Sequence, residues 1–156
     1  MPRCIVTTVF ALVMAMCLPG ACVAQNTADL TGTRPTSGSI WLDSMDLGGI
    51  DQEWGSPHGG HSVEGNPLTL RGVVYAHGVG THARSVIEVA LDGSATRFLS
   101  MVGVDDEKKG AGSVTFAVYV DGKKVTETGI LHGGDNPQLV SVDITGAKTL
   151  RLVLSL

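Results

Sequence analysis

The sequence is poor in several residue types, and each shortage excludes a class of protein. Phe, Trp and Tyr make up only 4% of the 156 residues, so few aromatic side chains are available for a binding surface. Lys and Arg number 11 against 15 Asp and Glu, which gives a net charge of −4. A mildly acidic chain lacks the positive surface that nucleic acid or anionic lipid requires. Neither kind of partner is therefore expected.

Cysteine is confined to the N-terminal region, at Cys4, Cys17 and Cys22. The rest of the chain cannot form disulfides, so its stability must come from an apolar core or from a bound metal. Apolar residues make up 43% of the sequence, enough for such a core. The length fits one domain better than two.

The sequence also lacks an apolar run long enough to cross a membrane as a helix. Residues 5–18 are mostly apolar, but a helix needs ~20 such residues to cross a bilayer, so no membrane span is expected. Arg3 precedes the run, and small residues follow it at 22–24. This order is typical of a signal peptide. We therefore predict a signal peptide at 1–24, cleavage before Gln25, and secretion to the periplasm or the medium.

Two other interpretations of the N-terminus stay open. The apolar run could remain as an anchoring helix, although it is short for that role. Residues 19–22 also resemble a lipobox, which would make Cys22 the acylated N-terminus of a lipoprotein, but Pro19 stands where such motifs usually carry Leu. Residues 25–38 are rich in Thr, Gly, Ser and Pro and have no apolar period, so we predict a linker there.

From Ser39 onward the apolar residues follow the two-residue period of β-strands. The run 97–104 is long and apolar, which is typical of a central strand. Asp121-Gly122 separates two alternating segments and is a strong hairpin signal. No segment has sustained helical periodicity, so we predict an all-β fold, a β-sandwich or jelly roll. The strands are expected at 40–42, 67–70, 73–75, 86–91, 97–104, 114–120, 124–128, 139–144 and 149–154.

Two tryptophans are candidates for different roles. Trp41 has apolar neighbours in a predicted strand, so we expect it in the core. Trp54 lies in a polar loop at 51–58. An exposed indole ring can stack on the apolar face of a sugar, but Trp54 could equally anchor its own loop. The sequence leaves both roles open.

His82 follows a glycine-containing segment and precedes Arg84. A neutral imidazole can both donate and accept a hydrogen bond, which suits a sugar hydroxyl, but a histidine here could instead brace the loop. Zinc needs three or four ligands in a defined geometry, and the five histidines do not show that spacing.

Carboxylates gather at 105–107, and Asp43 and Asp46 form a smaller group. Calcium prefers several oxygen ligands, so either group could bind it, or both could be solvated turns. A glycosidase needs two carboxylates ~5–10 Å apart across a cleft, whereas most acidic residues here fall in turns or at strand ends. The nucleophile motif Gly-x-Ser-x-Gly is absent. We therefore do not expect an enzyme.

Several short motifs occur in a specific order along residues 39–156. They include Trp41-Leu42-Asp43-Ser44-Met45-Asp46, Trp54-Gly55, Pro67 to Gly72, Tyr75-Ala76-His77-Gly78-Val79-Gly80-Thr81-His82-Ala83, and Gly103-Val104-Asp105-Asp106-Glu107. In this order the motifs resemble the NPCBM/CBM51 family, a carbohydrate-binding module attached to secreted glycosidases. The resemblance implies a β-sandwich that recognises glycans with terminal galactose, a role for calcium, and a glycoside hydrolase domain absent from this chain as partner.

The resemblance also suggests a site. The candidate carbohydrate-binding residues are Trp54, His58, His82, Arg84 and Asp105. The candidate calcium ligands are Asp43 and Asp106.

The chain departs from the family pattern at its end. That pattern continues into an Asp-rich segment and a closing strand, whereas this chain stops at Leu156. An unpaired strand edge would then be expected near the C-terminus, unless the last strand is internal. The alternative function is a degenerate interaction module that pairs through this edge and no longer binds sugar.

Overall fold

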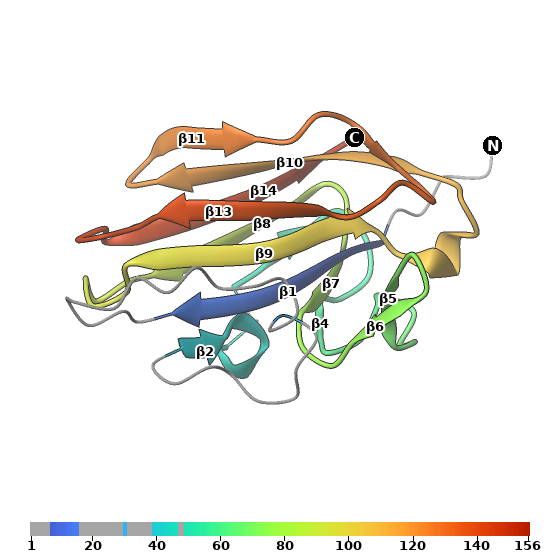
Figure 1. The fold of residues 1–156 in the computed structure, drawn as a ribbon, viewed down its shortest axis with the longest axis horizontal. Coiled ribbons are helices and arrows are strands. Elements are labelled where there is room, and N and C mark those ends of the chain that lie inside the picture. The colour runs from blue at the N-terminus through green and yellow to red at the C-terminus, as the bar shows by residue number, and fades with distance from the viewer. Residues whose placement is uncertain (1–6, 16–29, 31–38, 47–48) are drawn as a thin grey trace.

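Two antiparallel β-sheets enclose an apolar core in the computed structural model of the chain (Figure 1). The structure describes residues 7–15, 30, 39–46 and 49–156. Within them the helical elements are two short 3-10 helices, η2 (Leu42–Ser44) and η3 (Asp106–Lys108). The predicted all-β sandwich is confirmed.

The first sheet has the order β13-β9-β1-β7-β4, and β2 pairs with β1 beyond the end of β7. Its bounds are β13 (Gln138–Asp143), β9 (Arg97–Val104), β1 (Thr7–Ala15), β7 (Val79–His82), β4 (His58–Gly59) and β2 (Ser39–Trp41). β9 lies between two neighbours, so its predicted central position is confirmed. Sequence periodicity did not predict β1, which belongs to the segment interpreted as a signal peptide.

The second sheet has the order β11-β10-β14-β8-β3, and β12 pairs with β10. Its bounds are β11 (Lys123–Glu127), β10 (Ser113–Val120), β14 (Thr149–Ser155), β8 (Ser85–Ala90), β3 (Asp51–Gln52) and β12 (Leu131–His132). The Asp121-Gly122 turn has positive φ at both residues, 47° and 81°, and joins β10 to β11 as predicted. A separate hairpin consists of β5 (Leu68–Leu70) and β6 (Val73–Tyr75).

β9 contributes to two apolar clusters because its side chains alternate between the faces of the sheet. Phe98 and Val102 are fully buried in the core between the two sheets. Leu99 belongs to a second cluster with Leu30, Trp41, Leu68, Leu70 and Tyr75, and Met101 packs against it. A strand buried on both faces needs a continuous apolar run, which explains the sequence of 97–104. The expected core position of Trp41 is confirmed by its 4% exposure.

The C-terminal strand is internal. β14 pairs with β10 on one side and with β8 on the other, so the unpaired edge considered from the sequence does not lie on it. The edges of this sheet are β11 and β3. The alternative function, an interaction module, predicted pairing through an open edge at the C-terminal strand, and this strand has no open edge.

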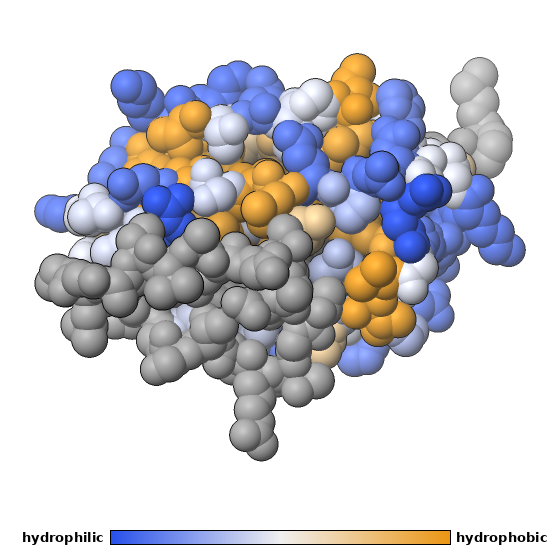
Figure 2. Space-filling view, in the orientation of Figure 1, coloured by the Kyte–Doolittle hydropathy of each residue, from blue (hydrophilic) through white to orange (hydrophobic). Residues whose placement is uncertain are grey.

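The predicted signal peptide and linker lie largely outside the described residues, as do all three cysteines. Of the predicted linker, only Leu30 is described, and it is buried. Among the residues that the structure describes, no helix is long and apolar enough to cross a membrane. Figure 2 shows that polar side chains divide the apolar surface on the viewed face into separate areas.

Candidate functional site

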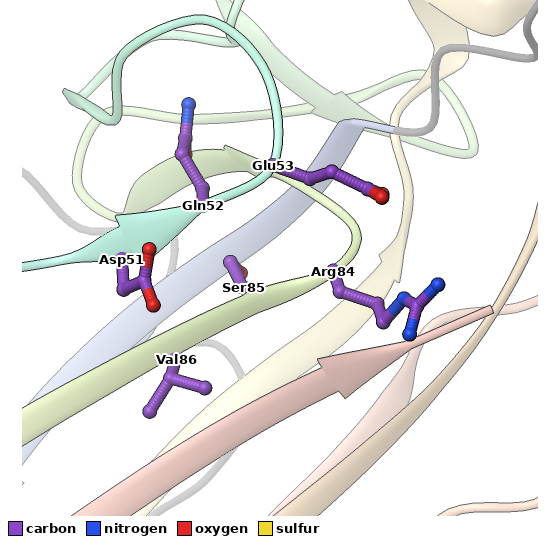
Figure 3. A pocket seen from close by; sticks show the side chains of 6 residues that line it. All are labelled: Asp51, Gln52, Glu53, Arg84, Ser85 and Val86. Carbon is purple, nitrogen blue, oxygen red and sulfur yellow. The ribbon is translucent and has the colours of Figure 1, made fainter.

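A pocket lies where β3 meets the beginning of β8 (Figure 3). Its volume is about 270 Å³, and its walls are formed by Asp51, Gln52, Glu53, Arg84, Ser85 and Val86. Asp51 and Gln52 pair with Val86 and Ser85 in antiparallel register. The amide of Glu53 donates to the carbonyl of Arg84 at 3.0 Å, which continues the contact past the end of β3. Two segments distant in sequence thus form one wall.

Trp54 follows the pocket-lining residues directly and is 50% exposed. Its ring lies 5.7 Å from the His82 ring, centroid to centroid, at an angle of 60°. Gln52 holds the loop: its amide nitrogen donates to the Trp54 carbonyl at 2.8 Å, and its amide oxygen accepts from the Thr81 hydroxyl at 2.6 Å. The indole is therefore presented to solvent by a loop that is fastened to β7.

His82 is buried beneath this loop, with 7% of its surface exposed. Burial lowers the pKa of His82, while the nearby Glu53 carboxylate and a backbone hydrogen bond at Ala83 partly oppose that shift. The imidazole is thus neutral near pH 7. Its buried Nδ1 atom has no hydrogen-bond partner within the described part of the chain. This placement suits a residue that supports Trp54 from below.

Charged groups of both signs surround the pocket. Asp51, Glu53 and Arg84 are all exposed. Figure 3 shows the Glu53 and Arg84 side chains extending in the same direction from adjacent backbones. The Arg84 guanidinium has no ion pair with any residue that the structure describes. Its N–H donors and the carboxylate acceptors are thus available to a ligand rich in hydroxyl groups.

The structure brings together three of the predicted binding residues, Trp54, His82 and Arg84. His58 lies on β4, where it pairs with Gly80, and its Nδ1 is 2.9 Å from the Ser62 carbonyl oxygen. It is not among the residues that line the pocket.

Asp105 is 1% exposed, and both of its carboxylate oxygens accept backbone hydrogen bonds. One accepts from the amide of Glu107 at 2.9 Å and the other from the amide of Thr69 at 2.9 Å. Burial raises the pKa of Asp105, and these two hydrogen bonds oppose the shift. The geometry gives Asp105 a bracing role between η3 and the hairpin of β5 and β6.

The two predicted calcium ligands are each engaged in a different loop. The Asp106 carboxylate accepts from the amides of Arg71 at 3.0 Å and Gly72 at 2.7 Å. Asp43 lies 3.1 Å from Nδ1 of His77, whose ring stacks on Trp41 with centroids 4.5 Å apart. No group of three or more His, Cys, Asp or Glu side chains among the described residues could hold a metal. Asp43 and Asp106 therefore lie in separate loops and do not form one shared carboxylate cluster among the described residues.

Besides Ser85 and Val86 on β8, the sequence interpretation missed three further members of the pocket wall, Asp51, Gln52 and Glu53. They precede Trp54 in the same polar loop, so an exposed tryptophan flanked by carboxylates was the available signal. Their approach to Arg84 depends on the pairing of β3 with β8.

Residues 38–155 match the model of the NPCBM/NEW2 domain. The chain belongs to this family. A solved relative, a CBM51 module of Clostridium perfringens GH95 in complex with methyl-galactose, superposes with a TM-score of 0.69 at 34% identity, covering 74% of this chain and 86% of that one. A second solved structure, CBM51-2 in complex with GlcNAc and the INT domains of Clostridium perfringens ZmpB, superposes with a TM-score of 0.67 at 29% identity, covering 74% of this chain and 26% of that one.

Two curated relatives of this NPCBM chain are glycosidases by name. A protein of Renibacterium salmoninarum assigned as an endo-alpha-N-acetylgalactosaminidase is 30% identical over 78% of the chain. An alpha-1,3-galactosidase B of Akkermansia muciniphila is 26% identical over 86% of the chain. The chain spans only 8% and 17% of the lengths of these relatives. The chain therefore matches a small part of each of these longer glycosidases and belongs to a family of carbohydrate-binding modules.

Proposed function

We propose that this NPCBM module binds galactose-type glycans at the pocket beside Trp54, and that it does so without catalysis. The observation that carries the proposal is the exposed Trp54 ring, which directly follows the pocket-lining residues 51–53 in sequence, together with the pocket-lining Arg84, which makes no ion pair among the described residues. The relative in complex with methyl-galactose and the galactosidase-type relatives support the choice of sugar.

In the proposed mechanism the indole face of Trp54 carries the apolar C–H face of a pyranose. The Arg84 guanidinium donates to sugar hydroxyl oxygens, and the Glu53 carboxylate accepts from sugar hydroxyl hydrogens. His82 and Gln52 do not touch the sugar but hold the loop in place. Each new hydrogen bond replaces one to water, so the net gain per contact is small. We expect a dissociation constant on the order of 1 mM for a monosaccharide.

The arrangement of the carboxylates in this pocket supports the proposed absence of catalysis. Asp51 and Glu53 line the pocket from one short segment, separated in sequence only by Gln52, rather than from opposite sides of a cleft. We further propose that the module acts outside the cytoplasm and serves a glycoside hydrolase. The leader-like residues 1–24 and the family's presence in large glycosidases support that setting.

Substitution of Trp54 tests the proposal. Trp54→Ala should weaken binding of methyl galactoside by about tenfold or more, which corresponds to ~1.4 kcal/mol. Trp54→Phe retains an aromatic face and should lose less. Isothermal titration or ligand-observed NMR on the full chain measures both. Unchanged affinity in a folded Trp54→Ala variant would remove this site from the proposal.

A further inference from the structure

The pocket beside Trp54 opens onto the outer face of the second sheet. On β8, Ile87 and Val89 are buried in the core between the sheets. Side chains alternate between the two faces of a strand, so Val86 and Glu88 point away from that core. Val86 also lines the pocket. The pocket is therefore continuous with the outer face, on which β8, β14 and β10 are neighbours.

A row of uncharged side chains crosses this face from the pocket. Val86 on β8 is directly opposite Val153 on β14, and Val153 is directly opposite Ala117 on β10. Directly opposed residues on one face have Cβ atoms about 5 Å apart, so their side chains touch. The row of Val86, Val153 and Ala117 thus forms a narrow apolar strip that begins at the pocket wall.

Tyr119 lies beyond the far end of the row. It follows Ala117 by two residues, so it is on the same face, about 12 Å from Val86 by strand spacing and rise. Arg151 is directly opposite Tyr119, and its guanidinium carbon lies 6.0 Å from the centre of the ring. Nε of Arg151 is also 3.5 Å from the Glu88 carboxylate. Both contacts orient Arg151 beside the ring.

Tyr119 and Trp54 are also distinguished by their exposure. The structure describes four other aromatic side chains in terms of exposure, and all are buried: Trp41, Tyr75, Phe98 and Phe116. Trp54 is 50% exposed, and Tyr119 is partly exposed. The two accessible rings therefore lie at the two ends of one surface, with the pocket and the apolar row between them. Such rings are suitable platforms for the apolar faces of sugars.

We propose that the ligand of this module is an oligosaccharide, whose terminal sugar occupies the pocket and whose following sugars lie along the row of Val86, Val153 and Ala117 as far as Tyr119. The inference rests on the proposed function and adds the class of ligand to it. The row accepts the C–H faces of the sugar rings, while Arg151 and Glu88 beside it supply a donor and an acceptor for hydroxyl groups.

The size of the row favours a glycan over a protein as its occupant. A stable protein interface takes about 800 Å² from each partner. The row from Val86 to Ala117 spans two strand spacings, about 9.6 Å, and is one residue wide. A single extended chain of sugar rings fits a strip of this shape, because each ring needs only one or two side chains beneath it.

The dependence of affinity on the length of the glycan tests this inference. The full chain is titrated calorimetrically with methyl galactoside and with galactose-terminated di-, tri- and tetrasaccharides. We expect the affinity to rise about fivefold or more from methyl galactoside to the longest glycan. Tyr119→Ala should remove this gain and leave the affinity for methyl galactoside unchanged. Tyr119→Phe keeps the ring and should retain most of the gain.

A second variant blocks the row itself. Val153→Lys places a long charged side chain between the pocket and Tyr119, so it should also remove the gain with length. Gln138→Lys is the matched control, because it adds the same side chain at an exposed position on β13 of the first sheet. The control should bind every glycan as the unmodified chain does. Circular dichroism establishes that each variant is folded.

The outcomes separate this inference from the proposed function. Binding of methyl galactoside with no gain for longer glycans, or a gain that survives both Tyr119→Ala and Val153→Lys, would overturn the inference and leave the proposed function in place. No binding of any of these sugars by folded protein would overturn both. A dimer in light scattering that Val153→Lys dissociates would assign this face to a second copy of the chain and would also overturn the inference.

Discussion

At the scale of single residues, the exposed fraction of a side chain distinguishes candidate site residues that the sequence could not tell apart. Trp54 is 50% exposed, whereas His82 beside it is 7% exposed. The sequence left open for both whether they touch a ligand or support a loop. Exposure depends on which segments fold over a residue, and local sequence does not contain that information. The exposure of Trp54 leaves its ring accessible to a ligand, whereas the burial of His82 suits a residue that supports the loop.

Arg84 provides the first residue-scale prediction. Arg84→Ala should weaken binding of methyl galactoside by about tenfold or more, because a hydrogen bond from a charged donor contributes roughly 1.5–3 kcal/mol. Arg151→Ala is the matched control, since Arg151 is an exposed arginine on β14 that does not line the pocket. Titration calorimetry compares the two variants with the unmodified chain. Equal losses in both variants would contradict a specific role for Arg84.

His82 gives a prediction about pH. Its pKa in the folded state is lowered below the ordinary value of 6.5, so below that value the unfolded chain binds the proton more readily. The contribution of His82 to stability is therefore complete above pH 6.5 and is lost as the pH falls toward the folded-state pKa. His82→Gln should remove this part of the acid sensitivity. Urea unfolding at about pH 7.5 and about pH 5.5 measures the difference.

His61→Gln serves as the control for this experiment, because His61 is exposed. It should retain the acid sensitivity of the unmodified chain. If His82→Gln loses as much stability on acidification as the unmodified chain does, the buried imidazole is not responsible.

At the scale of elements, most strands from β5 onward were predictable, including the three-residue β5 and β6, whereas the two-residue strands, β7 and the nine-residue β1 were not. The strand predicted at 97–104 matches β9 residue for residue, and the Asp121-Gly122 turn joins β10 to β11 as expected. Strands β3 and β4 have two residues each, too few for any period to be visible. β7 is buried at all four positions, so it lacks the alternation of a half-exposed strand. β1 lies within the segment predicted as a signal peptide, because a central strand and a leader have the same apolar composition.

Gly80 on β7 gives a prediction at this scale. A Cβ atom at position 80 would lie 2.2 Å from the backbone oxygen of His61, so the loop after β4 passes directly over this residue. Gly80→Ala should destabilise the fold by roughly 1–3 kcal/mol or more, because backbone rather than a flexible side chain must move. Gly129→Ala is the matched control, since no atom lies within 4 Å of its added Cβ. Its effect should stay within about 0.5 kcal/mol in chemical unfolding.

At the scale of the whole molecule, the all-β sandwich and the family were accessible from the sequence, but the location of the site was not settled. Arg84 and Glu53 are 31 positions apart, and only the pairing of β3 with β8 brings them to one pocket. The carboxylates at 105–107 drew attention because of their density. Asp105 and Asp106 accept from backbone amides of a hairpin more than thirty residues away, and Glu107 accepts from the side chains of Ser62 and Asn66, which the sequence does not reveal.

Calcium provides a prediction for the whole domain. The Asp43 and Asp106 carboxylates already accept hydrogen bonds in separate loops, and no ligand group is assembled among the described residues. We therefore expect the same melting temperature and the same sugar affinity with calcium and with a chelator. A rise in either with calcium would show that a metal binds and stabilises the folded state.

The central claim is that this NPCBM module recognises a galactose-type sugar at the pocket between β3 and β8. An amide NMR titration of the full chain with methyl galactoside tests it most directly. We predict saturable shifts concentrated at residues 51–54 and 84–86, with little change in the hairpin of β5 and β6. Saturable shifts centred on residues 105–107, or none in a folded protein at high sugar concentration, would contradict the account.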